Sequence, residues 1–277
     1  MRRLRRYSEP DEGSRSHVVS RKRVMRTDDE RTAPRPYYPL FVSLDRRVCL
    51  VIGGGAVGER KVRGLLQCGA SVRIVSRELT PWLKAMCERG AVTYAGSDYE
   101  PGQFENIDLV FAASSDPALN QRVAADASEG RVWCNMATDP DLGSFIIPAV
   151  VQRGPLTIAV STSGLSPAVA RNIREKLDQE FGPSWQAYLN LMGLLRKAIL
   201  ARGLESSENR RLLTEIADLP VVEWIEGGDV DRILDAIHRV CRPLLDLEEL
   251  ARILDKEWKP FSSSSPHYAI AVEPSDT

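Results

Sequence analysis

The sequence predicts an α/β protein built on a doubly wound parallel sheet of the Rossmann type. Short apolar runs alternate with helical patterns from residue 48 to residue 137, as in a parallel sheet covered by helices. The first run, Val48–Ile52, suits a strand that is buried on both faces. It leads directly into three glycines with the spacing G-x-G-x-x-G. A small strand-rich segment and an all-helical C-terminal domain are expected to follow the sheet.

The glycine-rich turn predicts a loop that binds a dinucleotide. Gly53 permits the tight turn, Gly55 lets a pyrophosphate approach the backbone, and Gly58 lets the helix pack closely on the strand. Apolar residues then recur with helical spacing as far as Gly69, a suitable stop. The start of that helix offers N–H groups and a positive dipole end to a phosphate. A turn that serves packing alone is the alternative.

The remaining elements of the sheet alternate along the chain. Strands are expected at 71–76, 91–95, 107–113 and 131–137, and helices at 81–89 and 117–130. Pro81 and Pro117 lie in first turns, where proline is favoured, and Asp116 is a typical N-cap.

Ligands of such sheets lie beyond the carboxyl ends of the strands. Ala113 and Ser114 follow the fourth strand and are expected near a cofactor, as is Asp116, although capping alone explains Asp116. At the tip of the second strand, Glu78 can hold the ribose hydroxyls of NAD, or Arg77 can meet the 2′-phosphate of NADP. A surface Arg–Glu pair without a ligand is a third interpretation.

Two further strands are expected at 143–151 and 156–161. The second runs into STSGLSP, residues 161–167, where Ser166 caps a helix over 167–181. A hydroxyl-rich loop before a helix is a second candidate anion site, with an ordinary serine cap as the alternative. The later helices are expected at 185–200, 207–218, 229–241 and 245–258.

The composition is that of an ordinary globular chain. Of the 277 residues, 43% are hydrophobic, and the formal net charge of −1 gives no general attraction to nucleic acid. No apolar run is long enough to cross a membrane. The five cysteines match no paired metal motif, so we expect buried thiols in a reducing cytoplasm.

Residues 1–36 mix many basic residues with acidic ones and have almost no apolar pattern. Such a segment cannot bury enough surface to order itself, and it lacks the features of a secretory signal or a transit peptide. We expect a disordered extension, with Met25 as an alternative start. An arm that binds nucleic acid or a partner is the other interpretation.

With these motifs in place, the chain resembles the precorrin-2 dehydrogenase and sirohydrochlorin ferrochelatase family, the N-terminal module of siroheme synthases. The resemblance covers residues 38–200 and rests on YPLFVSL, VIGGGAVGERKVRGLL, FAASSDPALNQRV, CNMATDPDLGSFIIPA and LTIAVSTSGLSPAVARNIREKL. Together with the patterns above, it divides the chain into a basic extension (1–36), an NAD-binding domain (37–142), a dimerisation segment (143–182), a helical domain (183–260) and a flexible tail (261–277).

The resemblance implies a homodimer that transfers a hydride from precorrin-2 to NAD⁺ and gives sirohydrochlorin. Some relatives then insert Fe²⁺. The family's NAD contacts fall on the glycine loop with Ala56 and Val57, and on Arg77 and Glu78. Because the substrate carries many carboxylates, the candidates for binding it are hydroxyls, an amide and a basic residue: Asn135, Ser161, Thr162, Ser163, Ser166 and Arg171.

One residue departs from the family pattern. Relatives usually carry an aspartate, to which catalysis is assigned, as the third residue after the asparagine of the fifth strand. That position is Thr138 in this chain, and Asp139 is one step later. Threonine cannot act as a base near neutral pH. Either Asp139 replaces the usual aspartate, or oxidation relies on positioning of the cofactor, or the second activity is lost.

The three histidines, His17, His238 and His267, all lie outside the Rossmann region. The sequence therefore predicts no metal site and leaves iron insertion open. Two rival functions remain: a regulatory Rossmann protein that senses NAD without catalysis, and a dehydrogenase of a different, small acidic substrate.

Overall fold

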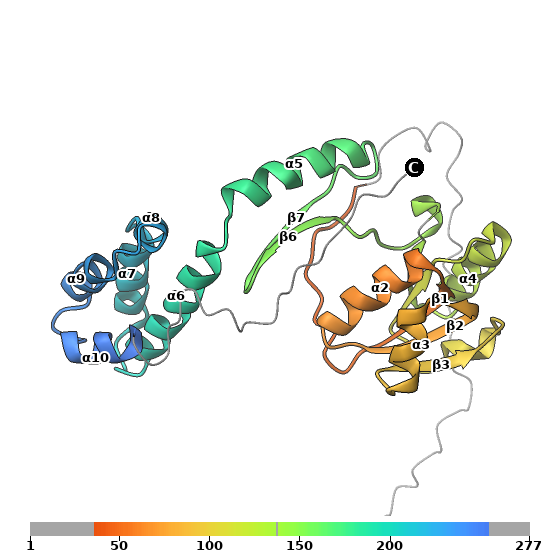
Figure 1. Cartoon of the computed structure of the whole chain (residues 1–277), viewed down its shortest axis with the longest axis horizontal. Helices are drawn as coiled ribbons and strands as arrows, with labels where there is room; N and C mark the ends of the chain where they lie inside the picture. Colours follow the sequence, from red (N-terminus) through yellow and green to blue (C-terminus); the bar gives the residue numbers. More distant parts are fainter. Residues whose placement is uncertain (1–35, 137, 255–277) are drawn as a thin grey trace, which may run out of the picture. The chain divides into compact units, whose positions relative to one another are not determined.

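The computed structural model describes residues 36–136 and 138–254, and it confirms the predicted fold class. A parallel sheet has the strand order β3-β2-β1-β4-β5, the order of a Rossmann fold. Figure 1 labels β1, β2 and β3 of this sheet. Its strands are β1 (Val48–Gly54), β2 (Ser71–Leu79), β3 (Val92–Gly96), β4 (Leu109–Ala112) and β5 (Trp133–Met136). The order reverses between β1 and β4, so the crevice expected to hold a ligand opens beside β1.

Helices cover both faces of this sheet. On one face, α2 (Ala56–Gln67) and α3 (Pro81–Glu88) bury Val62, Leu65 and Leu83 against side chains of β1, β2 and β4. On the other face, α4 (Pro117–Glu129) buries Val123 and Ala127. Alternate residues of β1 point into the two cores, which explains why the strand is apolar throughout.

The predicted helix ends are confirmed. Gly69 follows α2 with a φ of 79°, and the N–H of Ala70 donates to the carbonyl of Leu65. The Thr80 hydroxyl caps α3, and an Asp116 carboxylate oxygen accepts from two N–H groups of α4.

The next segment differs from the prediction at its start. The strand expected over 143–151 begins only at Ala149, as β6 (Ala149–Arg153), and pairs with antiparallel β7 (Leu156–Val160). The reason is that the N–H groups of Ser144 and Phe145 donate to the Cys134 carbonyl and tie this stretch to β5. Helix α5 (Pro167–Glu180) packs on the hairpin, and Arg153 of β6 donates to Asp178 of α5 at 2.8 Å.

The rest of the described chain is helical, as predicted. Helices α6 (Ser184–Leu200), α7 (Ser206–Ala217), α8 (Val221–Glu226), α9 (Val230–Cys241) and α10 (Leu247–Arg252) share one apolar core. Helix α8 was not among the expected helices. The short 3₁₀ turns η1 (Pro101–Phe104) and η2 (Pro140–Leu142) were not expected either.

No disulfide joins the five cysteines, all of which lie in the described part of the chain. Cys49, Cys134 and Cys241 are buried, as expected. The expectation is wrong for Cys68, which is exposed because it lies at the C-terminal end of α2. Almost all of the predicted extension and the whole predicted tail lie outside the described residues.

Candidate functional site

The outer glycines of the loop are fixed by close approaches of the backbone. Gly53 has a φ of 116°, and a Cβ there would lie 2.4 Å from the carbonyl oxygen of Ala113. A Cβ on Gly58 would lie 1.9 Å from the carbonyl oxygen of Gly53. Both distances are far inside van der Waals contact, so only glycine fits. The turn and the close packing are as predicted, and contact with a cofactor stays a prediction.

The middle glycine faces open space instead. A Cβ on Gly55 would meet no atom within 4 Å, and its φ of −80° is one that any residue can adopt. Gly55 is the N-cap of α2, and no side chain caps this helix. Ala56 and Val57, which form its first turn, are exposed. The start of α2 thus keeps both the backbone donors and the room that a pyrophosphate needs.

Gly54 joins this loop to the tip of β2, a link that sequence reasoning missed. Its N–H donates to the Ser76 hydroxyl at 2.9 Å, and that hydroxyl donates to the Glu78 carbonyl at 2.6 Å. A Cβ on Gly54 would lie 2.3 Å from the same carbonyl. Because β2 extends to Leu79 rather than ending at residue 76, Arg77 and Glu78 lie within the strand and directly beside the loop.

The two residues at this tip differ in their contacts. The guanidinium of Arg77 donates from Nε and Nη2 to one oxygen of Asp98, at 2.9 and 2.6 Å. Glu78 is exposed, and its side chain makes no hydrogen bond or ion pair with any described residue. The hydrogen bonds from Ser97 and Arg77 hold the pKa of Asp98 below its ordinary value, so Asp98 is charged at neutral pH.

The loop after β4 is held by a residue that the sequence did not single out. Asn120 of α4 is fully buried, accepts from the Ser114 N–H at 3.1 Å and donates to the Ser114 carbonyl at 2.8 Å. The Ala113 N–H donates to Ile52 of β1. Ala113 and Ser114 are therefore fixed at the carboxyl end of β4, next to Gly53. The only signal in the sequence was a polar residue on the inner face of a helix.

At the end of β5, Asn135 is buried and its amide donates to the Phe145 carbonyl at 3.2 Å. Phe145 meets Phe111 of β4 edge to face. Asn135 thus holds the 143–145 stretch against the sheet, and its predicted contact with a substrate stays a prediction.

The two candidate catalytic residues follow β5. Thr138 is exposed, and Asp139 is half-buried as the N-cap of η2, where its Oδ1 accepts from the Asp141 N–H at 3.0 Å. Both residues lie beyond the carboxyl end of the sheet, the side on which the glycine loop opens.

The hydroxyls of the 161–166 loop bond largely to the loop itself. The Thr162 hydroxyl donates to the Ser166 carbonyl and accepts from the Ser166 N–H. Ser166 caps α5 by accepting from the Val169 N–H at 3.3 Å, and Ser161 accepts from the Ser163 N–H. Ser163 has a φ of 54°, and its hydroxyl makes no hydrogen bond with any residue that the structure describes.

Two basic residues of these regions are placed differently. Arg171 is exposed on α5 and pairs with Glu175 one turn later, at 2.9 Å. Lys61 of α2 is half-buried and makes no hydrogen bond or ion pair with any described residue. Burial, together with the charge of Arg60, lowers the pKa of Lys61 to about 8. Sequence reasoning did not select Lys61, because its position on the helix shows only in the fold.

Known proteins match the two regions that carry these residues. Residues 40–149 match a family model described as NAD(P)-binding, and residues 153–180 match one described as sirohaem biosynthesis protein central. "Siroheme synthase 1" of Serratia proteamaculans is 38% identical over 175 residues, which are 63% of this chain and 37% of that protein. "Siroheme synthase 1" of Cronobacter sakazakii is 43% identical over 142 residues, 51% of this chain and 30% of that protein.

A solved structure covers more of the chain. "SirC, precorrin-2 dehydrogenase" superposes with a TM-score of 0.63 and 26% identity, over 73% of this chain and 100% of that one. The chain belongs to the family of the siroheme synthase N-terminal module and SirC. The predicted resemblance is confirmed. The chain spans less than half the length of the siroheme synthases that it matches.

Within this family match, the candidate residues fall into two groups. The NAD(P)-binding region contains the glycine loop, the β2 tip and Asp139, and the central region contains the 161–166 loop and Arg171. The helices from α6 onward lie outside both matches. The match supports an NAD(P)-binding domain and does not separate NAD from NADP.

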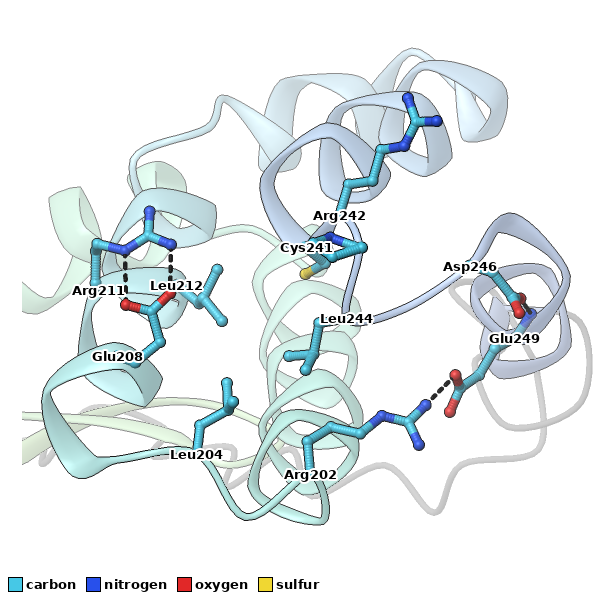
Figure 2. A pocket seen from close by; sticks show the side chains of 11 residues that line it. Arg202, Leu204, Glu208, Arg211, Leu212, Cys241, Arg242, Leu244, Asp246 and Glu249 are labelled. Atoms are coloured by element: carbon cyan, nitrogen blue, oxygen red, sulfur yellow. Dashed lines mark hydrogen bonds and ion pairs between the residues drawn. The ribbon is translucent and has the colours of Figure 1, made fainter.

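The helical region holds a cavity of about 620 Å³ that contains none of the predicted site residues (Figure 2). Leu204, Leu212 and Leu244 line it, together with the ion pairs Arg202–Glu249 and Arg211–Glu208. Among the described residues, no three His, Cys, Asp or Glu side chains gather as they would around a metal ion. None of the helices in the same residues is long and apolar enough to span a bilayer.

Proposed function

We propose that this chain is an NAD⁺-dependent dehydrogenase that oxidises precorrin-2 to sirohydrochlorin in siroheme biosynthesis. The observation that carries the proposal is the uncapped start of α2 at the glycine loop, in a chain whose fold covers the whole of a precorrin-2 dehydrogenase structure. The family relatives support a role in the siroheme pathway.

The residues of the loop fit the cofactor. The N–H groups at the start of α2 would bind the pyrophosphate, and the open side of Gly55 would admit it. Glu78 would accept from the ribose hydroxyls at the tip of β2. Ala113 and Ser114, which Asn120 holds in place, would lie beside the nicotinamide end of the cofactor. The nicotinamide, when bound, accepts the hydride of the oxidation.

Loss of a hydride from precorrin-2 must be accompanied by loss of a proton. We propose that the Asp139 carboxylate takes this proton, because its fixed position in the η2 cap holds it at the rim of the sheet. Thr138 lacks a group that accepts a proton near neutral pH and would contact the substrate only through its hydroxyl.

The substrate carboxylates would lie along the 161–166 loop and α5. Thr162 and Ser166 already bond to the loop backbone, so Ser163 and Arg171 have more capacity to bind an anion. Arg171 would have to exchange Glu175 for the substrate, which costs little because exposed ion pairs contribute at most about 1 kcal/mol. Asn135 and Ser161 complete the proposed set.

We also propose that the chain acts as a homodimer through residues 143–182. The two strands β6 and β7 form a sheet by themselves, which is marginally stable in water. Val169 and Ile173 are exposed one turn apart on α5, and Leu165 is exposed in the loop before it, so together they form an apolar stripe along the start of this helix. An Ile173→Lys variant should sediment as a monomer if this stripe is the interface, and an unchanged molecular mass would contradict it.

The experiment that tests the activity combines the purified full chain, NAD⁺ and enzymatically generated precorrin-2. We expect the absorption spectrum of sirohydrochlorin to develop together with NADH. Binding of NAD⁺ without any spectral change would favour the NAD-sensing alternative instead. Iron insertion stays an expectation from the resemblance, and no described residue adds to it.

A pair of variants tests the role of Asp139. Asp139→Asn should lower kcat by about 10²- to 10⁴-fold and leave the Kd of NAD⁺ unchanged. Adding Thr138→Asp to that variant places a carboxylate at the position usual in relatives and should restore part of the rate. Equal rates for Asp139→Asn and the parent would remove Asp139 from the mechanism.

A further inference from the structure

The contact between Arg77 and Asp98 lies at the end of the proposed cofactor site that distinguishes NAD from NADP. Arg77 lies on β2, two residues before Leu79, which is paired with Gly54 of the glycine loop. Asp98 follows β3, the next strand of the sheet. One Asp98 oxygen accepts from Arg77 at 2.6 and 2.9 Å, and the other accepts from the Ser97 hydroxyl at 2.8 Å. Both oxygens are therefore held in place.

We propose that Asp98 makes the site selective for NAD⁺ by accepting the Arg77 hydrogen bonds that a 2′-phosphate would otherwise receive. The proposal rests on the proposed function, because it assumes that a dinucleotide binds along the glycine loop with its adenosine ribose at the tip of β2. A 2′-phosphate needs a cation with available donors at this position. Arg77 is the basic residue at the tip, and Asp98 already accepts from its Nε and Nη2.

The local charge supports the same selectivity. Arg77 contributes +1, while Glu78 and Asp98 each contribute −1. A phosphate that carries nearly two negative charges would therefore approach a tip with an excess of negative charge, whereas ribose hydroxyls can donate to Glu78. The Arg77–Asp98 pair is exposed and contributes little to folding, so its charge can be changed without loss of the fold.

The test measures nucleotide binding directly, on the full-length chain by titration calorimetry. The ratio of the Kd of NADP⁺ to that of NAD⁺ should fall at least tenfold in Asp98→Asn, because the charge on Asp98 is lost and Arg77 can turn to the 2′-phosphate. Adenosine 2′,5′-bisphosphate and AMP, which carry only this end of the cofactor, should show the same change in their ratio.

Two further variants make the result specific. Arg77→Gln combined with Asp98→Asn should lose most of the gain, since the released arginine is the proposed phosphate ligand. Glu208→Gln removes a carboxylate from another exposed arginine pair, in the helical region, and should leave the ratio unchanged.

The outcomes separate the two proposals. If the parent chain binds NAD⁺ but the ratio of the two Kd values in Asp98→Asn stays within twofold of the parent ratio, the role of Asp98 is overturned and the proposed function stands. A gain that persists in the double variant would also overturn it, because Arg77 would then not be the ligand. A parent chain that binds neither nucleotide would overturn both.

Discussion

The starts of α2 and α5 differ in how their backbone donors are used. Both helices follow a strand and a short loop, and both loops are rich in small residues. Helix α2 begins at Gly55, which has no side chain to cap it. Helix α5 begins at Ser166, whose hydroxyl accepts from the third residue of the helix. Of these two helices, α2 therefore leaves more of its first N–H groups to a ligand.

One basic residue of each helix shows a parallel difference. Lys61 of α2 is half-buried and has no ionic partner among the residues that the structure describes. Arg171 of α5 is exposed and pairs with Glu175. A helix N-terminus is a weak indication of an anion site until its cap is known, because a serine or aspartate cap already satisfies one or two of the donors.

The largest expected effect removes the close approach that shapes the start of α2. Gly58→Ala places a Cβ 1.9 Å from the Gly53 carbonyl, so we expect a loss of about 3 kcal/mol in the free energy of unfolding. Urea unfolding measures it. Gly64→Ala, in the same helix with no atom within 4 Å, should instead gain about 0.5–1 kcal/mol. Similar values for the two variants would contradict the packing described.

Filling the open side of the loop should break binding without breaking the fold. Gly55→Val places its Cβ where no protein atom lies within 4 Å, so the melting temperature should fall only slightly, through loss of a favourable N-cap residue. The Kd of NAD⁺, measured by calorimetry, should rise about 100-fold, equivalent to about 2.8 kcal/mol. In the loop before α5, Gly164→Ala should instead lower stability without affecting binding. Its φ of 84° makes alanine strained by about 1 kcal/mol, and NAD⁺ should bind as before.

The cap of α5 should have a moderate effect on stability alone. Ser166→Ala removes the acceptor for the Val169 N–H and should cost about 1 kcal/mol in urea unfolding. Ser166→Asp supplies another capping oxygen and should recover most of this loss. If Ser166→Ala unfolds like the parent, the hydroxyl is not an effective cap, and the contrast with α2 is weaker than described.

The smallest effect depends on pH. Lys61 has a pKa of about 8 in the folded chain and about 10.4 when unfolded. Below pH 8 it is protonated in both states, and the folded state bears the full cost of burying the charge. Between these values the unfolded state holds more protons, so this cost disappears as the pH rises. Lys61→Met should therefore stabilise by about 0.5–1 kcal/mol at pH 7 and by much less at pH 10. Urea midpoints at both pH values measure this, and Arg171→Met should show no such gain.

Local patterns in the sequence predicted much of the site. The glycine spacing gave the loop, and Asp116 and Ser166 were identified as caps because a cap depends only on its own helix. The strand expected over 143–151 was partly wrong, since Ser144 and Phe145 bond to Cys134 in a strand ten residues earlier. No local pattern encodes such a contact.

The same reason explains the residues that were missed. Asp98 meets Arg77 across 21 positions because β3 pairs with β2 in a particular register. Asn120 is recognisable as a clamp only once α4 is placed on the sheet. In both cases the partner is set by the fold, while each residue alone looks like an ordinary surface polar group.

The Ser76 hydroxyl bridges the amide of Gly54 and the carbonyl of Glu78. Its consequence is mechanical. The glycine loop, which would bind the phosphates, and the tip of β2, which would bind the ribose, are joined by these hydrogen bonds, so the two segments should move together. The two subsites would therefore already have their relative position before a nucleotide binds, and binding would require little ordering of the protein.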